Sequence, residues 1–281
     1  MNRLIIGFTA TWITLGAAVV APAVEPPASA DKQDGVKRVL GVPYGDDERQ
    51  RLDLYLPEGV EGYPTLVFVH GGGYSKGDRR DVAGLGETLA QRGIGVVAVG
   101  YRLHPQVKHP EQIQDIARAF AAVREHVGRH GGRANALFVG GHSAGAQLAA
   151  LLGVDSQYLG HEKLKLDDIR GVVALSGGYR LDENRADVFG DAENRAGASP
   201  INQVRRGAPA FFLGYADNDS PGREDLTREF AAALEAQGVP VQVVKATGRN
   251  HGTLFTGLTS ADPTLLAIAD FIRRESIHDR D

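Results

Sequence analysis

The sequence contains no cysteine, which excludes disulfide bonds, thiolate zinc sites, iron–sulfur centres and a cysteine nucleophile. It also has no long block of charge of either sign. With 31 Lys and Arg residues against 35 Asp and Glu residues, its formal net charge is −4. Nothing therefore indicates a nucleic-acid-binding surface or a polybasic membrane patch.

Several cofactor motifs are absent as well. The sequence has no phosphate-binding loop, no His-Glu-x-x-His zinc motif and no Ser-x-x-Lys motif built on Ser143. Residues 84–89 lack the third glycine of a dinucleotide fingerprint and do not follow a predicted strand. Residues 217–222 do not form a calcium loop, because Pro221 replaces the third ligand and Arg228 stands in place of the glutamate. The sequence therefore implies no cofactor.

The first thirty residues differ in composition from the rest. Arg3 precedes an apolar stretch from Leu4 to Val20, and residues 28–30 form a small-x-small cleavage pattern. We predict a signal peptide over residues 1–30, with an uncleaved membrane anchor as the alternative. Either one would place residues 31–281 outside the cytoplasm, in the periplasm or secreted.

The remaining residues predict a single α/β domain. Short apolar runs alternate with stretches of helical periodicity, and 42% hydrophobic residues suffice for one large core. The predicted strands are 37–42, 51–56, 65–69, 95–99, 136–139, 171–175, 209–213 and 239–244. The predicted helices are 82–91, 110–127, 143–152, 223–237 and 263–273. Repeated strand–helix units after an antiparallel edge pair give a mostly parallel eight-stranded sheet with helices on both faces.

One segment interrupts this alternation. Residues 176–206 have scattered charge and glycine and no sustained periodicity. The segment follows the carboxyl end of a predicted strand, where ligands bind in open α/β sheets. We therefore predict a small lid or substrate-binding insertion rather than a second domain.

Ser143 is the candidate nucleophile. It lies at the centre of Gly141-x-Ser143-x-Gly145, between a predicted strand and a predicted helix. A serine at such a sharp turn is typical of a nucleophile elbow, in which glycines permit strained backbone and close helix–strand approach. The five-residue pattern is short enough to occur by chance, so the hypothesis depends on partner residues.

A base and an acid are expected downstream of the serine. Only His161, His251 and His278 follow Ser143, and His251 alone lies in a loop that leaves a predicted strand. Between serine and histidine, the predicted strand 209–213 is followed by Gly214 and two carboxylates. We predict Asp217 as the acid, on its Gly-x-x-Asp spacing, with Asp219 as the alternative.

Backbone N–H groups are the expected stabilisers of the tetrahedral oxyanion. A run of three glycines, Gly71 to Gly73, follows His70 at the end of the predicted strand 65–69. Glycines there would let the backbone approach a substrate without a Cβ clash. Ala144, directly after the candidate nucleophile at a helix N-terminus, would supply another N–H group.

Taken together, His70-Gly-Gly-Gly73, Tyr101-Arg-Leu-His-Pro105, Gly141-His-Ser-Ala-Gly145 and Gly214-x-x-Asp217 with a late His251 resemble the α/β-hydrolase superfamily. The chain is most similar there to hormone-sensitive-lipase-like esterases and to the bacterial feruloyl-esterase and kynurenine-formamidase-like group. His142 before the serine resembles the feruloyl-esterase and formamidase branch more than the lipase branch.

The resemblance implies a Ser143, Asp217 and His251 triad, with Gly72, Gly73 and Ala144 forming the oxyanion hole. It implies a serine carboxylesterase that acts through an acyl-enzyme on a small-molecule ester. An amidase or formamidase on the same triad, or a non-catalytic extracellular binding protein, are the alternatives.

Other motif residues have expected structural roles. We expect Asp115 to anchor Arg102 or a loop, Tyr101 and Arg102 to brace the glycine loop, and Tyr74 to line the pocket or pack in the core.

Overall fold

The computed structural model describes residues 32–33 and 35–277. The predicted signal peptide lies outside these residues. Among the helices of the described residues, none has the length and apolar character needed to cross a membrane.

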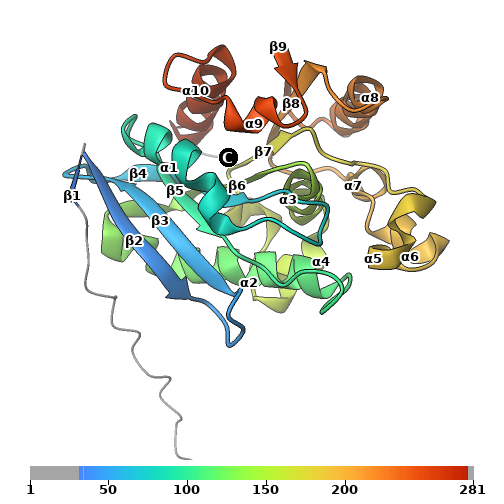
Figure 1. Cartoon of the computed structure of the whole chain (residues 1–281), viewed down its shortest axis with the longest axis horizontal. Helices are drawn as coiled ribbons and strands as arrows, with labels where there is room; N and C mark the ends of the chain where they lie inside the picture. Colours follow the sequence, from blue (N-terminus) through green and yellow to red (C-terminus); the bar gives the residue numbers. More distant parts are fainter. Residues whose placement is uncertain (1–31, 34, 278–281) are drawn as a thin grey trace, which may run out of the picture.

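One twisted sheet organises the molecule, and its strand order is β1-β2-β3-β5-β4-β6-β7-β8-β9 (Figure 1). The strands are β1 (Lys32–Gln33), β2 (Val36–Pro43), β3 (Arg51–Pro57), β4 (Tyr63–Val69), β5 (Gly95–Val99), β6 (Gly132–His142), β7 (Gly171–Leu175), β8 (Ala210–Asn218) and β9 (Val241–Asn250). Pairing is antiparallel from β1 to β3 and between β3 and β5, and parallel from β5 through to β9. The prediction of eight mostly parallel strands is confirmed, and the two-residue β1 is a short addition at the edge.

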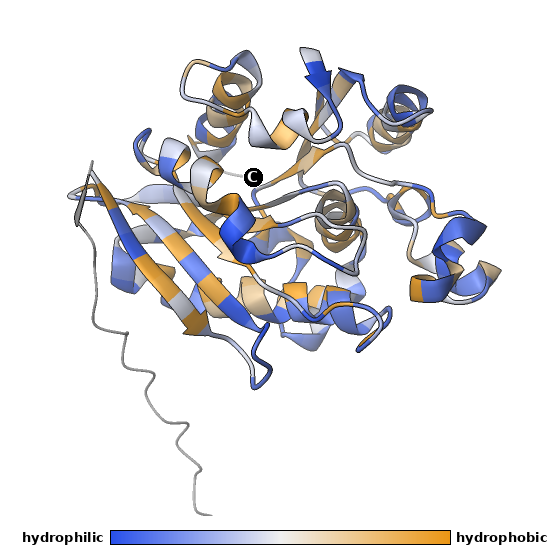
Figure 2. Ribbon diagram, in the orientation of Figure 1, coloured by the Kyte–Doolittle hydropathy of each residue, from blue (hydrophilic) through white to orange (hydrophobic). Residues whose placement is uncertain are grey.

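Helices cover both faces of the sheet, as predicted. The longer helices are α1 (Ala83–Ala90), α2 (Glu111–His126), α3 (Ala144–Val154), α8 (Arg223–Ala236) and α10 (Pro263–Ile277). Helices α2, α3 and α8 pack on one face of the sheet, and α1 and α10 pack on the other. Figure 2 shows the central strands in mostly hydrophobic colours between these two layers.

Strand β4 illustrates how the sheet is buried on both faces. Its successive side chains point to opposite faces, so Val67 and Val69 join the core under α2 and α3. Leu66 and Phe68 join the core under α1 and α10 instead. A strand covered on both faces is a continuous apolar run, and that pattern made β4 predictable.

Short helices make up the segment in which the sequence shows no sustained helical or strand periodicity. Residues 176–206 contain the 3₁₀ helix η4 (Glu183–Arg185) and the helices α5 (Ala186–Phe189), α6 (Ala192–Gly197) and α7 (Pro200–Gln203). Other short elements are η1 (Arg79–Val82), η2 (Val127–His130), α4 (Ser156–His161), η3 (Leu166–Asp168) and α9 (Thr253–Thr256). Helices α5 and α6 lie at the periphery of the molecule, near the edge occupied by α7 (Figure 1).

Candidate active site

Ser143 occupies the sharp turn between β6 and α3. Its φ of 55° lies in the left-handed region, which residues other than glycine adopt only at an energetic cost. Its N–H donates to the Leu175 carbonyl at 2.8 Å. A Cβ on Gly141 would lie 2.4 Å from the Gly145 carbonyl carbon, and a Cβ on Gly145 would lie 2.1 Å from the Val69 oxygen. Both glycines are therefore required for the close approach of α3 to the strands, as the elbow motif predicts.

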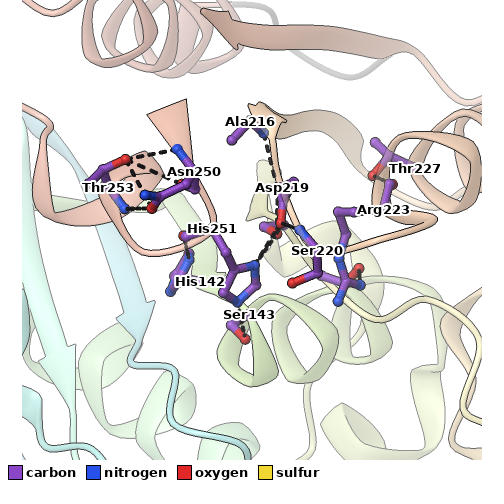
Figure 3. Close-up of polar contacts among 12 residues, drawn as sticks. His142, Ser143, Ala216, Asp219, Ser220, Arg223, Thr227, Asn250, His251 and Thr253 are labelled. Carbon is purple, nitrogen blue, oxygen red and sulfur yellow. Dashed lines mark hydrogen bonds and ion pairs between the residues drawn. The ribbon is translucent and has the colours of Figure 1, made fainter. Parts of the chain in front are cut away.

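His251 reaches Ser143 from the loop that follows β9. Its Nε2 lies 2.9 Å from the Ser143 Oγ, and its Nδ1 faces the opposite way, toward β8 (Figure 3). The structure thus brings the predicted nucleophile and base together from residues 108 positions apart. This distance is within hydrogen-bond range for proton transfer from the hydroxyl.

The carboxylate that meets His251 is Asp219, so the preference for Asp217 is wrong. The Asp219 Oδ1 lies 2.7 Å from His251 Nδ1. Strand β8 continues through Gly214 to Asn218, which leaves Asp217 on the strand with an exposed side chain. Its carboxylate accepts hydrogen bonds from the N–H groups of Gly248 and Arg249, at 2.8 and 3.0 Å. Asp217 therefore holds the loop before His251 rather than the imidazole.

Four donors surround the Asp219 carboxylate. Burial alone would raise its pKa, but hydrogen bonds from His251, the Ala216 N–H, Ser176 and the Ser220 N–H outweigh burial and hold the pKa below its usual range. Its side chain is 3% exposed, against 32% for His251. The site therefore keeps a fixed negative charge behind the imidazole, where it stabilises a positive charge on the ring.

The sequence patterns missed two residues that contact His251. Ser176, at the end of β7, places its Oγ 2.8 Å from His251 Nδ1 and 2.7 Å from the Asp219 Oδ2. His142 places its Nε2 2.8 Å from the His251 carbonyl oxygen, and its ring stacks on Phe255. Burial and the neighbouring His251 lower the pKa of His142 to about 4. A neutral His142 can therefore donate to that carbonyl.

The three predicted oxyanion donors lie in the glycine loop and at the start of α3. Gly73 and Ala144 line the pocket beside Ser143. Within the described residues, no group accepts a hydrogen bond from the N–H of Gly72, Gly73 or Ala144. Gly72 also shapes the loop, because its φ is 116° and a Cβ there would lie 2.0 Å from the Lys76 oxygen. The N–H groups of all three residues therefore remain candidates for binding a substrate oxygen.

Buried side chains fix the glycine loop from behind. The Tyr101 hydroxyl donates to the His70 carbonyl at 3.2 Å, and the two rings stack at 4.5 Å. Asp115 receives the Arg102 guanidinium at 2.7 Å and the Gln50 amide at 2.7 Å. The expected role of Tyr101 and the expected pairing of Asp115 with Arg102 agree with these contacts. The polar contacts of Arg102 all go to Asp115, so its expected bracing of the glycine loop stays a prediction.

A pocket of about 200 Å³ opens beside Ser143. Its walls come from the glycine loop, from the start of α8 and from residues 176–206. The segment predicted as an insertion near the ligand therefore borders the nucleophile. Among the described residues, no cluster of three or more His, Asp or Glu side chains has the arrangement of a metal site.

Known proteins resemble this chain in both sequence and fold. A sequence family named BD-FAE matches residues 52–168. The isoprenylcysteine alpha-carbonyl methylesterase ICME of Arabidopsis thaliana is 30% identical over 238 residues, which are 75% of this chain and 56% of the plant protein. The kynurenine formamidase of Danio rerio is 28% identical over 78% of this chain and 76% of the fish protein. The chain thus spans little more than half the length of the plant methylesterase.

Solved structures carry the same fold. A truncated carbohydrate esterase from gut microbiota superposes with a TM-score of 0.77, at 19% sequence identity, over 90% of this chain and all of that one. At this identity the likeness concerns the fold alone. The sheet order, the helices on both faces and the serine at the elbow after β6 are those of the α/β-hydrolase fold.

Proposed function

We propose that this chain, a member of the α/β-hydrolase superfamily, is a serine carboxylesterase with the triad Ser143, His251 and Asp219. The observation that carries the proposal is the continuous contact from Ser143 Oγ to His251 Nε2, at 2.9 Å, and from His251 Nδ1 to Asp219, at 2.7 Å. A serine, an imidazole and a buried carboxylate in this order are the arrangement that activates a hydroxyl nucleophile. The methylesterase relative supports an ester as the substrate.

The reaction begins when His251 accepts the hydroxyl proton of Ser143 at Nε2. The Ser143 Oγ then forms a bond to the ester carbonyl carbon, and the carbonyl π electrons move onto its oxygen. The N–H groups of Gly72, Gly73 and Ala144, which have no acceptor among the described residues, donate to this oxyanion. As the tetrahedral intermediate collapses, the bond to the alcohol oxygen breaks, and His251 returns the proton to that oxygen. An acyl-serine and a free alcohol result.

Hydrolysis of the acyl-serine repeats these steps with water. His251 removes a proton from a water molecule that attacks the acyl carbon, and then protonates Ser143 as the carboxylic acid leaves. Asp219 keeps its charge throughout and orients the imidazole with Nδ1–H toward itself. The loop contacts of Asp217 to Gly248 and Arg249 keep His251 in position for both steps.

Turnover of p-nitrophenyl acetate by the wild type and by Ser143→Ala tests the proposal. We expect Ser143→Ala to lose activity by several orders of magnitude while its circular dichroism spectrum and melting temperature stay close to the wild type. Covalent labelling of the wild type, but not of Ser143→Ala, by a fluorophosphonate probe would identify the nucleophile. An unlabelled wild type without turnover would instead favour a non-catalytic binding protein.

An amidase or formamidase is the second candidate, and the fish kynurenine formamidase relative favours it. The same triad can attack an amide carbonyl, with His251 protonating the leaving nitrogen. Comparing kcat/KM for N-formylkynurenine and for aryl acetates separates the two candidates. We expect the aryl acetate to be the better substrate.

We also propose that the protein acts outside the cytoplasm, in the periplasm or secreted. The proposal rests on Arg3, the apolar stretch from Leu4 to Val20 and the cleavage pattern at residues 28–30. N-terminal mass analysis of the exported protein tests it, and a chain that begins at Asp31 is the expected product.

A further inference from the structure

The pocket beside Ser143 carries an excess of positive charge. Three arginines line it, Arg180, Arg185 and Arg223, together with one acidic residue, Asp182. Arg180 forms an ion pair with Glu229, so its charge is matched. Across the described residues, no carboxylate lies within ion-pair distance of Arg185 or Arg223. Two guanidinium groups thus line the pocket without an ion-pair partner, and Asp182 is the one carboxylate in the lining.

Arg185 is held over the glycine loop. Its guanidinium lies 5.7 Å from the centre of the Tyr74 ring, in cation–π geometry. That ring is fixed by an edge contact with Phe189 at 5.0 Å and by a hydrogen bond from its hydroxyl to Gln147 at 3.2 Å. Since Tyr74 directly follows Gly73, Arg185 is positioned next to the loop that supplies an oxyanion donor.

Arg223 is held at the other wall of the pocket, at the first residue of α8. It donates through Nη1 to the Gly177 carbonyl oxygen. Its Nε is buried and finds no hydrogen-bond partner in the described part of the chain. Figure 3 shows Arg223 beside Ser220, on the side of His251 opposite to His142. Its Nη2 donates no hydrogen bond within the described part of the chain and is not among the buried atoms, so this end of the guanidinium is available to an acceptor in the pocket.

We propose that this pocket selects esters that carry a carboxylate, and that Arg185 and Arg223 bind that carboxylate. This inference rests on the proposed esterase function. A guanidinium matches a carboxylate in both charge and planar hydrogen-bond geometry, and unmatched cations in a partly closed pocket favour an anionic ligand. A volume of about 200 Å³ accommodates about six or seven water-sized groups, so the expected substrate is a short acid ester.

Matched esters test this inference. Monoethyl adipate, which carries a carboxylate on the acyl chain, is compared with neutral ethyl hexanoate. 4-Acetoxybutanoate, which carries it on the alcohol part, is compared with butyl acetate. Acid release is followed by titration at constant pH, and the measured quantity is the ratio of kcat/KM for the anionic ester to that for its neutral match. We expect at least one ratio to exceed about ten in the wild type, from a charge-assisted contact.

Single-arginine variants then assign the preference. Arg185→Gln and Arg223→Gln should each lower that ratio by about tenfold. Arg273→Gln, on α10, removes the same charge outside the residues that line the pocket and should leave the ratio unchanged. Ratios near or below one in both wild-type series, or equal ratios in the wild type and both pocket variants, would overturn the inference. Absence of hydrolysis of all four esters and of p-nitrophenyl acetate would overturn the esterase proposal itself.

Discussion

Replacing Asp219 by asparagine removes the negative charge behind His251 and leaves the size of the side chain unchanged. The Asp219 Oδ1 accepts from His251 Nδ1 and from the Ser220 N–H, and its Oδ2 accepts from the Ala216 N–H and Ser176. An asparagine amide group at the Oδ2 position would face the Ala216 N–H, a second donor. At the Oδ1 position it would face the Ser220 N–H and force His251 into the tautomer that cannot accept the serine proton.

Both orientations therefore weaken catalysis, by loss of charge or by the wrong tautomer. We expect kcat for a p-nitrophenyl ester to fall by about 10⁴-fold, equivalent to about 5 kcal/mol of transition-state stabilisation. Asp217→Asn is the matched control, since it makes the same chemical change two residues away. Asparagine keeps an oxygen acceptor for one of the two loop N–H groups and loses the other contact at this exposed position, so kcat should fall by no more than about tenfold.

Steady-state kinetics of the two purified variants, with circular dichroism to verify folding, gives the comparison. Fluorophosphonate labelling rates supply a second readout of serine activation. If Asp217→Asn lost activity by orders of magnitude while Asp219→Asn stayed within tenfold of the wild type, the assignment of Asp219 as the triad acid would be refuted.

Three further changes, the first with a control on α1, test the elbow and its surroundings. Gly145→Ala places a Cβ against the Val69 oxygen and should lower the free energy of unfolding by about 1–3 kcal/mol. Gly84→Ala, in open space on α1, is the control and should raise it by about 0.5–1 kcal/mol. Urea titration measures both changes. The pKa of His142 is lowered in the folded chain, so below about pH 6.5 the unfolded chain binds more protons than the folded chain. The free energy of unfolding therefore falls as the pH falls. The free energy of unfolding of His142→Gln should therefore fall by about 1.5 kcal/mol less than that of the wild type between pH 6.5 and 5, and equal losses would contradict this. Ser176→Ala removes a hydroxyl from the triad acid and should lower kcat about tenfold in the same ester assay.

Local patterns determine the parts of this fold that could be predicted. Strands buried on both faces are short apolar runs, and the helices between them show an apolar stripe, so the order of elements follows from the sequence. The elbow could be predicted for a similar reason. Gly141 and Gly145 are needed because any Cβ would meet backbone atoms, and this local requirement leaves a recognisable motif.

The triad acid could not be located in this way, because the end of β8 is set by its neighbour. Gly214 favours an end of the strand, yet Tyr215 and Ala216 still pair with Lys245 and Ala246 of β9. This pairing carries Asp217 along the strand with its side chain toward solvent. The first residue beyond the strand that can turn back to His251 is Asp219. Sequence spacing alone contains no information about where such a long-range pairing stops.

The same dependence on neighbouring strands explains why Ser176 was missed and why it matters. Ser143 and Ser176 both have a positive φ, of 55° and 54°, at the ends of adjacent strands. The N–H of Ser143 donates to the last residue of β7, and the N–H of Ser176 donates to Gly214 of β8, at 2.7 Å. Each strained serine is thus held by the next strand in the sheet. Two glycines follow Ser176, and this pattern indicates a serine at the end of a strand. Only the order of the strands in the sheet shows that Ser176 is a neighbour of the triad. Ser143 and Ser176 therefore keep their relative positions through strand pairing, and Asp219 is fixed beside them by Ser176 and by the N–H groups of Ala216 and Ser220 in its own turn.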